Sequence, residues 1–254
     1  MNPAQVAKAA NLIRSARHVV VLTGAGISTP SGIPDFRSPR SGLWEQADPA
    51  TVASIWGFRR DPAAFYAWLR PLAQAMAQAQ PNQAHQALAA MEKAGLVKAV
   101  ITQNIDGLHQ KAGSQRVFEL HGHVRTAICL RCGRETPAAE PLAALLETGR
   151  IPRCAGCGGV LKPNVVLYGE LLPEDVFLAA EAEANACDLM WVVGSSLTVA
   201  PASLLPEEAI RRRALLVIVN RMATELDGRA AVVLRDDVAE VLPAIAVACG
   251  VEGW

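Results

Sequence analysis

Residues 18–26 of this 254-residue chain read His-Val-Val-Val-Leu-Thr-Gly-Ala-Gly, and this stretch decides the fold. A β-branched apolar run that ends in glycines predicts a buried strand followed at once by a tight turn. Similar apolar runs at 97–101, 189–193 and 215–219 alternate with segments of helical periodicity. Strands that are apolar throughout must be covered on both faces. We therefore predict an α/β fold with a parallel sheet and helices on both of its faces.

Helices are predicted where apolar residues recur every three or four positions. The segments with this spacing are residues 6–13, 174–186, 206–213 and 236–248. Two regions interrupt the alternation of strand and helix. Residues 27–81 are rich in Pro, Gly, Trp and Ala and predict short helices, whereas residues 122–163 contain four cysteines and lack a long apolar strand. We interpret the second region as a small module inserted into the α/β domain.

Two Cys-x-x-Cys pairs in this module have the spacing of a zinc site. The four residues are Cys129, Cys132, Cys154 and Cys157. Four thiolates complete a tetrahedral shell, so the predicted Zn²⁺ ion is structural and has no open position for catalysis. Cys187 and Cys249 lie in apolar segments, and we expect them to be small buried hydrophobic residues. This use of cysteine suits a reducing cytoplasm better than a disulfide framework.

The composition argues against several functional classes. Hydrophobic residues make up 51% and charged residues 19%, which suits a compact domain rather than a disordered chain. The net charge is zero, so nothing global indicates nucleic acid or an anionic membrane. Residues 122–163 do hold six Lys or Arg against three Glu. Zinc-bound thiolates would offset that excess, and we interpret it as an ordinary solvated surface. Neither a signal peptide nor a bilayer-spanning apolar run is evident.

The glycine turn suits a dinucleotide. Gly24 and Gly26 follow the first predicted strand, and a Gly-x-Gly turn there lets backbone amides approach a pyrophosphate closely. The third glycine of the usual fingerprint is missing, because Thr29 and Pro30 follow. An ordinary tight turn therefore stays open as an alternative at this point.

A second glycine-containing stretch, residues 31–38, reads Ser-Gly-Ile-Pro-Asp-Phe-Arg-Ser. The aromatic face of Phe36 suits a nicotinamide ring, and Arg37 can contact a phosphate through two parallel hydrogen bonds. The alternative is a surface loop with one packed phenylalanine.

Polar residues follow the predicted strands. Residues 102–109 read Thr-Gln-Asn-Ile-Asp-Gly-Leu-His, residues 194–196 read Gly-Ser-Ser and residues 220–221 read Asn-Arg. Ligands of open α/β sheets bind at the carboxyl ends of the strands, so we expect these groups to meet at one edge. A helix N-cap would account for Asn104 or Asp106, but not for every polar group in the stretch.

Residues 119–123 read Glu-Leu-His-Gly-His and follow another short predicted strand. Histidine has an unperturbed pKa near neutrality, so His121 is a candidate general base. His121 and His123 could instead be metal ligands or satisfied core residues, although four cysteines already complete a zinc shell.

Taken in order, these motifs resemble those of the sirtuins, the NAD⁺-dependent protein-lysine deacylases, of bacterial or archaeal type. The matching stretches span most of the chain and are residues 24–28, 32–37, 102–109 and 121–122, the four cysteines, residues 163–170 and 194–197, and Asn220. The resemblance implies a Rossmann-like NAD-binding domain, residues 1–121 and 164–254, with a helical insert at about 35–80. It implies a zinc-ribbon module over residues 122–163.

The resemblance also implies the site residues. His121 and Asn104 would be catalytic, and Ile105 and Asp106 would hold the nicotinamide amide. The residues implied to bind NAD⁺ are Gly24, Ala25, Gly26, Thr29, Asp35, Phe36, Arg37, Gln103, Asn104, Ile105, Asp106, His121, Gly194, Ser195, Ser196, Asn220, Arg221 and Val238. Those implied to border the acyl-lysine peptide are Val166, Leu167, Tyr168, Gly169, Glu170 and Leu197.

The implied reaction moves the acetyl group of an N6-acetyl-lysine to ADP-ribose and releases nicotinamide, free lysine and O-acetyl-ADP-ribose. Sirtuins that remove acidic acyl groups carry a Tyr-x-x-Arg pair. Tyr66 is present, but Leu69 occupies the arginine position, and Arg70 lies one residue later, about 100° around a helix. We therefore expect an apolar pocket for acetyl or longer aliphatic groups.

Other functions stay open on the sequence. They are removal of longer or acidic acyl groups, mono-ADP-ribosyl transfer to protein, a zinc-ribbon binding module without turnover, and an NAD-dependent dehydrogenase. We expect a cytoplasmic monomer whose partners are acetylated lysine side chains and NAD⁺, with no specific nucleic acid and no membrane.

Overall fold

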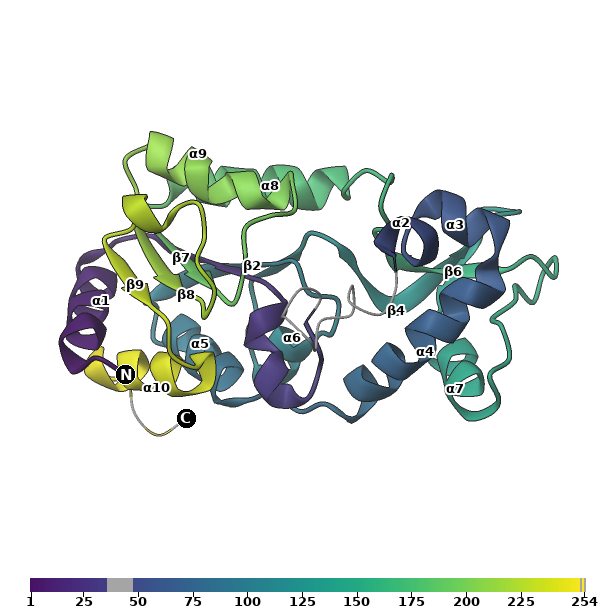
Figure 1. Ribbon diagram of the computed structural model, residues 1–254, viewed down its shortest axis with the longest axis horizontal. Helices are drawn as coiled ribbons and strands as arrows, with labels where there is room; N and C mark the ends of the chain where they lie inside the picture. Colours follow the sequence, from purple (N-terminus) through teal and green to yellow (C-terminus); the bar gives the residue numbers. More distant parts are fainter. Residues whose placement is uncertain (36–47, 252, 254) are drawn as a thin grey trace. The chain divides into compact units, whose positions relative to one another are not determined.

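The computed structural model describes residues 1–35, 48–251 and 253 (Figure 1). The chain divides into two compact units. Unit 1 comprises Met1–Ser31, Gln80–Leu120 and Glu174–Trp254, and unit 2 comprises Gly32–Ala79 and His121–Pro173. Within the described ranges, every helix is too short or too polar to cross a bilayer.

A six-stranded parallel sheet forms the centre of unit 1, in the order β3-β2-β1-β7-β8-β9. Its strands are β1 (Val19–Thr23), β2 (Val97–Thr102), β3 (Val117–Glu119), β7 (Leu189–Val193), β8 (Leu215–Val219) and β9 (Val232–Leu234). Every residue of β1 and β7 is buried, as their continuous apolar sequences predict. The predicted parallel sheet is confirmed, and the three-residue β9 is an addition that the sequence analysis missed.

Helices cover both faces of this sheet. Figure 1 shows α8 and α9 along one face and α1, α5 and α10 against the other. The helices of unit 1 are α1 (Pro3–Ser15), α5 (Gln83–Lys93), α6 (Leu108–Ala112), α8 (Glu174–Ala186), α9 (Leu205–Arg211) and α10 (Val238–Ala248). Three of them begin at N-cap residues whose side chains accept a backbone amide: Asn2 accepts from Ala4, Asn82 from Ala84 and Asp237 from Ala239.

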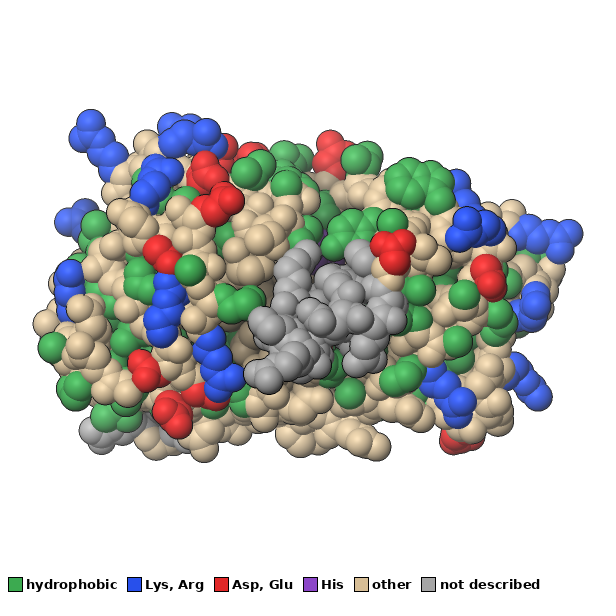
Figure 2. All heavy atoms as spheres, viewed as in Figure 1, with side chains coloured by type: hydrophobic (Ala, Val, Ile, Leu, Met, Phe, Trp, Pro, Cys, Tyr) green, Lys and Arg blue, Asp and Glu red, His purple; other side chains and the backbone are tan. Residues whose placement is uncertain are grey.

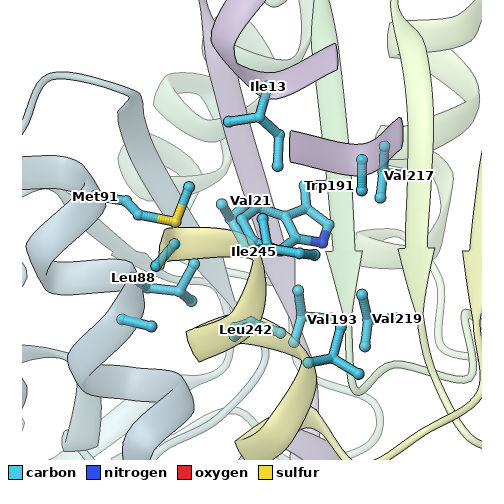
Figure 3. Packing of buried hydrophobic residues seen from close by; sticks show 14 of the residues in the cluster. Ile13, Val21, Leu88, Met91, Trp191, Val193, Val217, Val219, Leu242 and Ile245 are labelled. Carbon is cyan, nitrogen blue, oxygen red and sulfur yellow. The ribbon is translucent and has the colours of Figure 1, made fainter. Parts of the chain in front are cut away.

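The core of unit 1 is built around Trp191 of β7, whose side chain is fully buried. Figure 3 shows its ring among Val21 of β1, Ile13 of α1 and Ile245 of α10. Alternate residues of each strand point to this face, and a fully buried side chain of this kind contributes about 1.5–3 kcal/mol. Burial of the α1, α5 and α10 apolar faces against the strands therefore fixes the strand order.

Unit 2 contains a three-stranded antiparallel sheet in the order β5-β4-β6. Its elements are α2 (Pro49–Val52), α3 (Ile55–Arg60), α4 (Pro62–Gln78), β4 (Gly122–Cys129), β5 (Glu135–Pro137), α7 (Ala139–Thr148) and β6 (Leu161–Val165). Asp61 caps α4 by accepting from the amides of Ala63 and Ala64. The rings of Phe58, Phe65 and Tyr66 pack edge to face with centroids 5.0–6.1 Å apart, which joins α3 to α4. The predicted helical insert is thus present, although α4, with 17 residues, is longer than the short helices predicted for this region.

Candidate functional site

The strand order of unit 1 reverses between β1 and β7. The chain proceeds from β1 to β2 and β3 on one side of this point and from β7 to β8 and β9 on the other. In open parallel sheets, such a switch point opens a crevice at the carboxyl ends of the strands. Turns that begin at Gly24 and Gly194 follow the two central strands, so the predicted motifs do meet at this edge.

The glycines at this edge allow the two turns to touch. The Gly24 amide donates to the Val193 carbonyl at 3.1 Å, and the Gly26 amide donates to the Gly194 carbonyl at 2.9 Å. A Cβ atom on Gly24 would lie 2.8 Å from the Gly194 oxygen. Gly194 has a φ of +61°, and a Cβ atom there would lie 2.3 Å from the Ile27 nitrogen. The Gly-x-Gly sequence is therefore required for turn-to-turn packing, which uses the amides of both glycines.

A buried polar network joins the β1 turn to the end of β2. The Asn104 side-chain amide donates to the Gly24 carbonyl at 3.1 Å and to the Ser28 hydroxyl at 3.2 Å. Ser28 in turn donates to the Asp106 carboxylate at 2.7 Å. Burial raises the pKa of Asp106, and hydrogen bonds from the Leu108 amide and Ser28 partly offset that rise. The network holds one amide and one carboxyl group in defined positions.

Ser195 organises the β7 side of the edge. Its hydroxyl accepts from the Gln103 side-chain amide at 2.9 Å and from the Leu197 amide at 3.2 Å. Leu197 has a φ of +56°, which is rare for a bulky residue and costs about 1–3 kcal/mol. Such strain persists only where neighbouring contacts enforce it, so the Ser195–Leu197 turn is a functional candidate.

Three more hydrogen-bonding side chains, Thr23, Thr102 and His109, lie beneath this edge. Thr23 donates to Thr102 at 2.8 Å, and Thr102 also accepts from the Asn104 amide at 3.1 Å. His109 Nε2 lies 3.0 Å from the Thr23 hydroxyl, which has already used its proton, so this nitrogen is the donor. The His109 ring packs edge to face on His85 with centroids 4.9 Å apart. Burial lowers the pKa of His85 to about 4 and also lowers that of His109, so both imidazoles are neutral near pH 7.

The remaining predicted NAD⁺ residues are placed as follows. Asn220 is buried and donates to the Met222 carbonyl at 2.9 Å, while Arg221 is paired with Asp237, the N-cap of α10. Val238 is buried in the first turn of the same helix. Ala25 lies in the turn after β1, and the Thr29 hydroxyl donates to the Gly26 carbonyl. The other predicted residues that the structure describes are Ile105, Ser196 and the half-buried Asp35. The predicted Phe36 and Arg37 lie outside the described residues.

The four cysteines of unit 2 converge as predicted. Their sulfur atoms all lie within 4.8 Å of one another, with Cys129 to Cys157 at 3.5 Å and Cys132 to Cys154 at 3.8 Å. A tetrahedral shell with Zn–S bonds of about 2.3 Å has sulfur atoms about 3.8 Å apart, so the donor set fits zinc. Hydrogen bonds from the amides of Gly156 and Cys157 lower the pKa of Cys154, which favours a thiolate.

Cys187 and Cys249 belong to unit 1 and are not members of this cluster. Burial raises the pKa of Cys187 to about 12 and that of Cys249 to about 11, which makes both thiols unreactive. Cys187 is buried as predicted, whereas Cys249 is only partly buried and packs against the core cluster. Among the described residues, His121 and His123 are not part of the metal-ligand group.

His121 immediately precedes β4 in unit 2. Its carbonyl accepts from the Val166 amide at 2.9 Å. Gly122 has a φ of +70°, and a Cβ atom there would lie 2.0 Å from the Asn164 carbonyl oxygen. Only glycine therefore allows the start of β4 to lie against β6, and this contact places His121 beside the predicted substrate stretch.

The predicted substrate stretch, residues 166–170, is held by backbone hydrogen bonds on its other side. The Tyr168 amide donates to the Ala53 carbonyl at 2.9 Å, and the Ile55 amide donates to the Tyr168 carbonyl at 3.0 Å. Gly169 has a φ of +88° and lies against the ring of Trp56. The backbone of this stretch is fixed, whereas the Tyr168 side chain stays exposed.

Tyr66 and Arg70 bind backbone groups of unit 2. The buried Tyr66 hydroxyl donates to the Leu161 carbonyl at 2.6 Å, and burial raises its pKa. Arg70 donates to the Leu146 carbonyl through Nε at 3.2 Å and Nη2 at 2.7 Å, near the carboxyl end of α7. Leu69, which precedes Arg70 in the sequence, is buried.

A family model described as Sir2 family matches residues 24–201. The chain belongs to the Sir2 family. A relative named NAD-dependent protein deacetylase, from Thermodesulfovibrio yellowstonii, is 45% identical over 238 residues, covering 94% of this chain and 93% of the relative. A relative named NAD-dependent protein deacylase 2, from Archaeoglobus fulgidus, is 47% identical over 242 residues, covering 95% and 94%.

A solved structure described as Sir2-p53 peptide-NAD+ is similar over nearly the whole length of this Sir2 protein. The TM-score is 0.87 and the sequence identity 42%, and the match covers 95% of this chain and 97% of that one. The likeness therefore extends over most of both units.

Sequence reasoning missed several residues that support the Sir2 site. Ser28, Thr23 and Thr102 were not singled out as site residues, although each borders a predicted strand end. Lys162 was counted only as surface charge, but it is buried. A lone lysine in a strand flanked by apolar residues is a signal for a buried ion pair.

Proposed function

We propose that this chain is an NAD⁺-dependent protein-lysine deacetylase. The proposal is carried by the Asn104–Ser28–Asp106 network, which places an amide and a carboxyl group at the switch point of a parallel sheet. The relatives from Thermodesulfovibrio yellowstonii and Archaeoglobus fulgidus are named as deacetylase and deacylase, which supports the same activity.

NAD⁺ is assigned to the carboxyl edge of the unit 1 sheet. In this proposal Ile105 and Asp106 hold the nicotinamide carboxamide, and Asn220 and Ser195 contact the adenosine part. The remaining proposed contacts are Gly24, Ala25, Gly26, Thr29, Asp35, Phe36, Arg37, Gln103, Asn104, Gly194, Ser196, Arg221 and Val238.

The reaction begins when the acyl oxygen of the substrate lysine attacks C1′ of the nicotinamide ribose. The C1′–nitrogen bond breaks, nicotinamide leaves with its electron pair, and an imidate links the lysine to ADP-ribose. Neutral His121 then removes a proton from the ribose hydroxyls, so the 2′-oxygen attacks the imidate carbon. Water completes the release of free lysine and O-acetyl-ADP-ribose. An amide oxygen is a poor nucleophile, so fixed geometry supplies much of the rate.

Zinc has a structural role in this proposal. Cys129, Cys132, Cys154 and Cys157 hold the ion, and a four-thiolate shell leaves no position for substrate. When bound, zinc supplies a cross-link between the two ends of the module.

Acetyl and longer aliphatic groups are the proposed acyl substrates. Tyr66 and Arg70 already donate to the carbonyls of Leu161 and Leu146. Recruiting them to a succinyl or malonyl carboxylate would break these hydrogen bonds, and an unpaired carboxylate in an apolar pocket is costly. We therefore assign a low rate on acidic acyl groups.

The proposed partners are NAD⁺ and acetylated lysine side chains, and the proposed form is a monomer in a reducing compartment such as the cytoplasm. Four zinc-binding thiols favour reducing conditions. Figure 2 shows acidic and basic side chains intermixed on the drawn face, and the net charge is zero. This distribution does not favour a nucleic-acid partner.

The test is incubation with NAD⁺ and a panel of acyl-lysine peptides, followed by mass spectrometry. Nicotinamide, deacetylated peptide and O-acetyl-ADP-ribose should appear in equal amounts. Transfer of the adenine-end label of NAD⁺ to protein without deacylation would instead indicate an ADP-ribosyltransferase.

A further inference from the structure

Lys162 of β6 is a buried cation. Its residue is 4% exposed, although lysine is rarely buried without a partner. The ammonium donates to the Val165 carbonyl at 2.8 Å and the Pro163 carbonyl at 3.2 Å, and it lies 2.9 Å from the Glu170 carboxylate. An ammonium group has three protons, and all three have acceptors in this arrangement.

Glu170 connects this cation to the substrate stretch. Its Oε2 atom, which contacts Lys162, also accepts from the Leu167 amide at 2.9 Å. The Glu170 amide donates to the Leu167 carbonyl at 3.0 Å, which closes the turn around Gly169. One carboxylate oxygen therefore links the buried ammonium to the backbone of this turn.

The rest of the stretch is fixed from two other directions. Val166 bonds to the His121 carbonyl, and Tyr168 bonds to the backbone on either side of Ser54. Replacing a buried ion pair by apolar residues is often neutral or stabilising, so stability alone is a weak reason for this pair. Directional hydrogen bonds to a single turn are a better reason, because an apolar pair would leave the Leu167 amide without an acceptor.

We propose that Lys162 and Glu170 are positioning residues that set the backbone of residues 166–169 for the acyl-lysine peptide. This rests on the proposed function, in which that stretch binds the substrate as an added strand. Strand addition uses backbone amides and carbonyls, so a rotated turn loses affinity for the peptide. Neither residue is among those proposed to contact NAD⁺ or the reacting atoms, so the expected defect is confined to the peptide.

The experiment compares Lys162→Met, Glu170→Gln and the double variant with a surface control, Glu147→Gln on α7. The KM for an acetyl-lysine peptide, the KM for NAD⁺, kcat, the melting temperature and zinc content are measured for each. We expect each single variant to raise the peptide KM by roughly tenfold while the KM for NAD⁺ stays within about twofold. The peptide KM of the double variant should not exceed that of the more impaired single variant, because the two residues act as one unit.

The double variant protects the test against unfolding, since it leaves no unpaired buried charge. A lower melting temperature with an unchanged peptide KM would overturn the proposal, as would an equal rise in both KM values. Should the unaltered protein fail to deacetylate any peptide, the proposed function is wrong. The positioning role of Lys162 and Glu170 is then tested by hydrogen exchange of the 166–170 amides without substrate. Exchange must accelerate in Glu170→Gln but not in Glu147→Gln.

Discussion

The Val166 amide donates a 2.9 Å hydrogen bond to the carbonyl of His121. This bond joins the proposed general base to the proposed peptide-binding stretch through backbone atoms alone. Side-chain substitutions at His121 should therefore change the chemistry without moving the stretch that binds the substrate. Gly122 is needed for this close contact, because a Cβ atom there would clash with the Asn164 carbonyl oxygen.

His121→Ala is expected to lower kcat for deacetylation by about 100-fold to 10,000-fold, the range for removal of a general base. The backbone bond to Val166 survives the change, so the melting temperature and peptide affinity should stay close to those of the unaltered protein. Turnover is measured by nicotinamide release and affinity by fluorescence anisotropy of a labelled peptide. An undiminished kcat would show that His121 is not the base.

Gly122→Ala should be far more damaging than a glycine change in an equally strained backbone. A Cβ atom at Gly122 would lie 2.0 Å from the Asn164 oxygen, whereas Gly95, with a φ of +76°, has open space around it. Both variants adopt a left-handed conformation at a cost of about 1 kcal/mol, and the clash adds roughly 1–3 kcal/mol at Gly122 only. Equal losses in denaturant unfolding would contradict the packing argument.

Tyr66→Phe should cost about 1 kcal/mol of stability, because the Leu161 carbonyl loses its buried donor. The ratio of kcat/KM for acetyl-lysine to that for succinyl-lysine should not change, since the hydroxyl binds backbone rather than substrate. Steady-state kinetics on the two peptides provide the measurement. A succinyl rate that exceeds the acetyl rate in the unaltered protein would refute the proposed acyl preference.

Cys129→Ser should remove zinc and lower activity together. β4 begins beside His121 and ends at Cys129, so loss of the metal releases one end of the strand that positions the base. Zinc content by mass spectrometry and deacetylation are measured against Cys187→Ser, whose thiol lies outside the cluster. Retained activity in a zinc-free Cys129→Ser protein would show that deacetylation does not depend on zinc binding.

His85 should make the protein less stable in mild acid. Burial lowers its folded pKa to about 4, whereas the unfolded chain protonates it near 6.5. The unfolded state binds more protons between these values, so the free energy of unfolding decreases as the pH falls through that window. From about pH 6.5 to about pH 5.5 the loss approaches roughly 1 kcal/mol.

His85→Leu removes the contribution of His85 to the pH dependence of stability and replaces the ring by an apolar side chain. Its free energy of unfolding, from denaturant titrations, should change less with pH than that of the unaltered protein. The difference between the two proteins isolates His85 from the acid sensitivity of the zinc thiolates. Parallel pH curves would mean that His85 does not contribute.

Local pattern was sufficient for much of the architecture. Continuous burial of β1 and β7 follows from their apolar, β-branched sequences, and the convergence of the cysteines follows from the spacing of Cys-x-x-Cys pairs. The three-residue β9 was missed because so short an apolar run has no periodicity of its own. The roles of Gly24 and Gly26 were only partly predictable, since their contact is with Gly194, far along the chain.

By itself, the sequence determined the parallel sheet, the four cysteines that converge, the family and the polar residues at the strand ends. These features depend on apolar runs, on the spacing of Cys-x-x-Cys pairs and on the order of motifs, all of which can be read from residues close together in the chain. Only the tertiary structure decided that Gly194 packs into the first turn, that His109 supports Thr23, and that Lys162 is a buried cation tied to Glu170. These contacts depend on how separate segments pack, and desolvation of a charge is a property of that packing rather than of the residue.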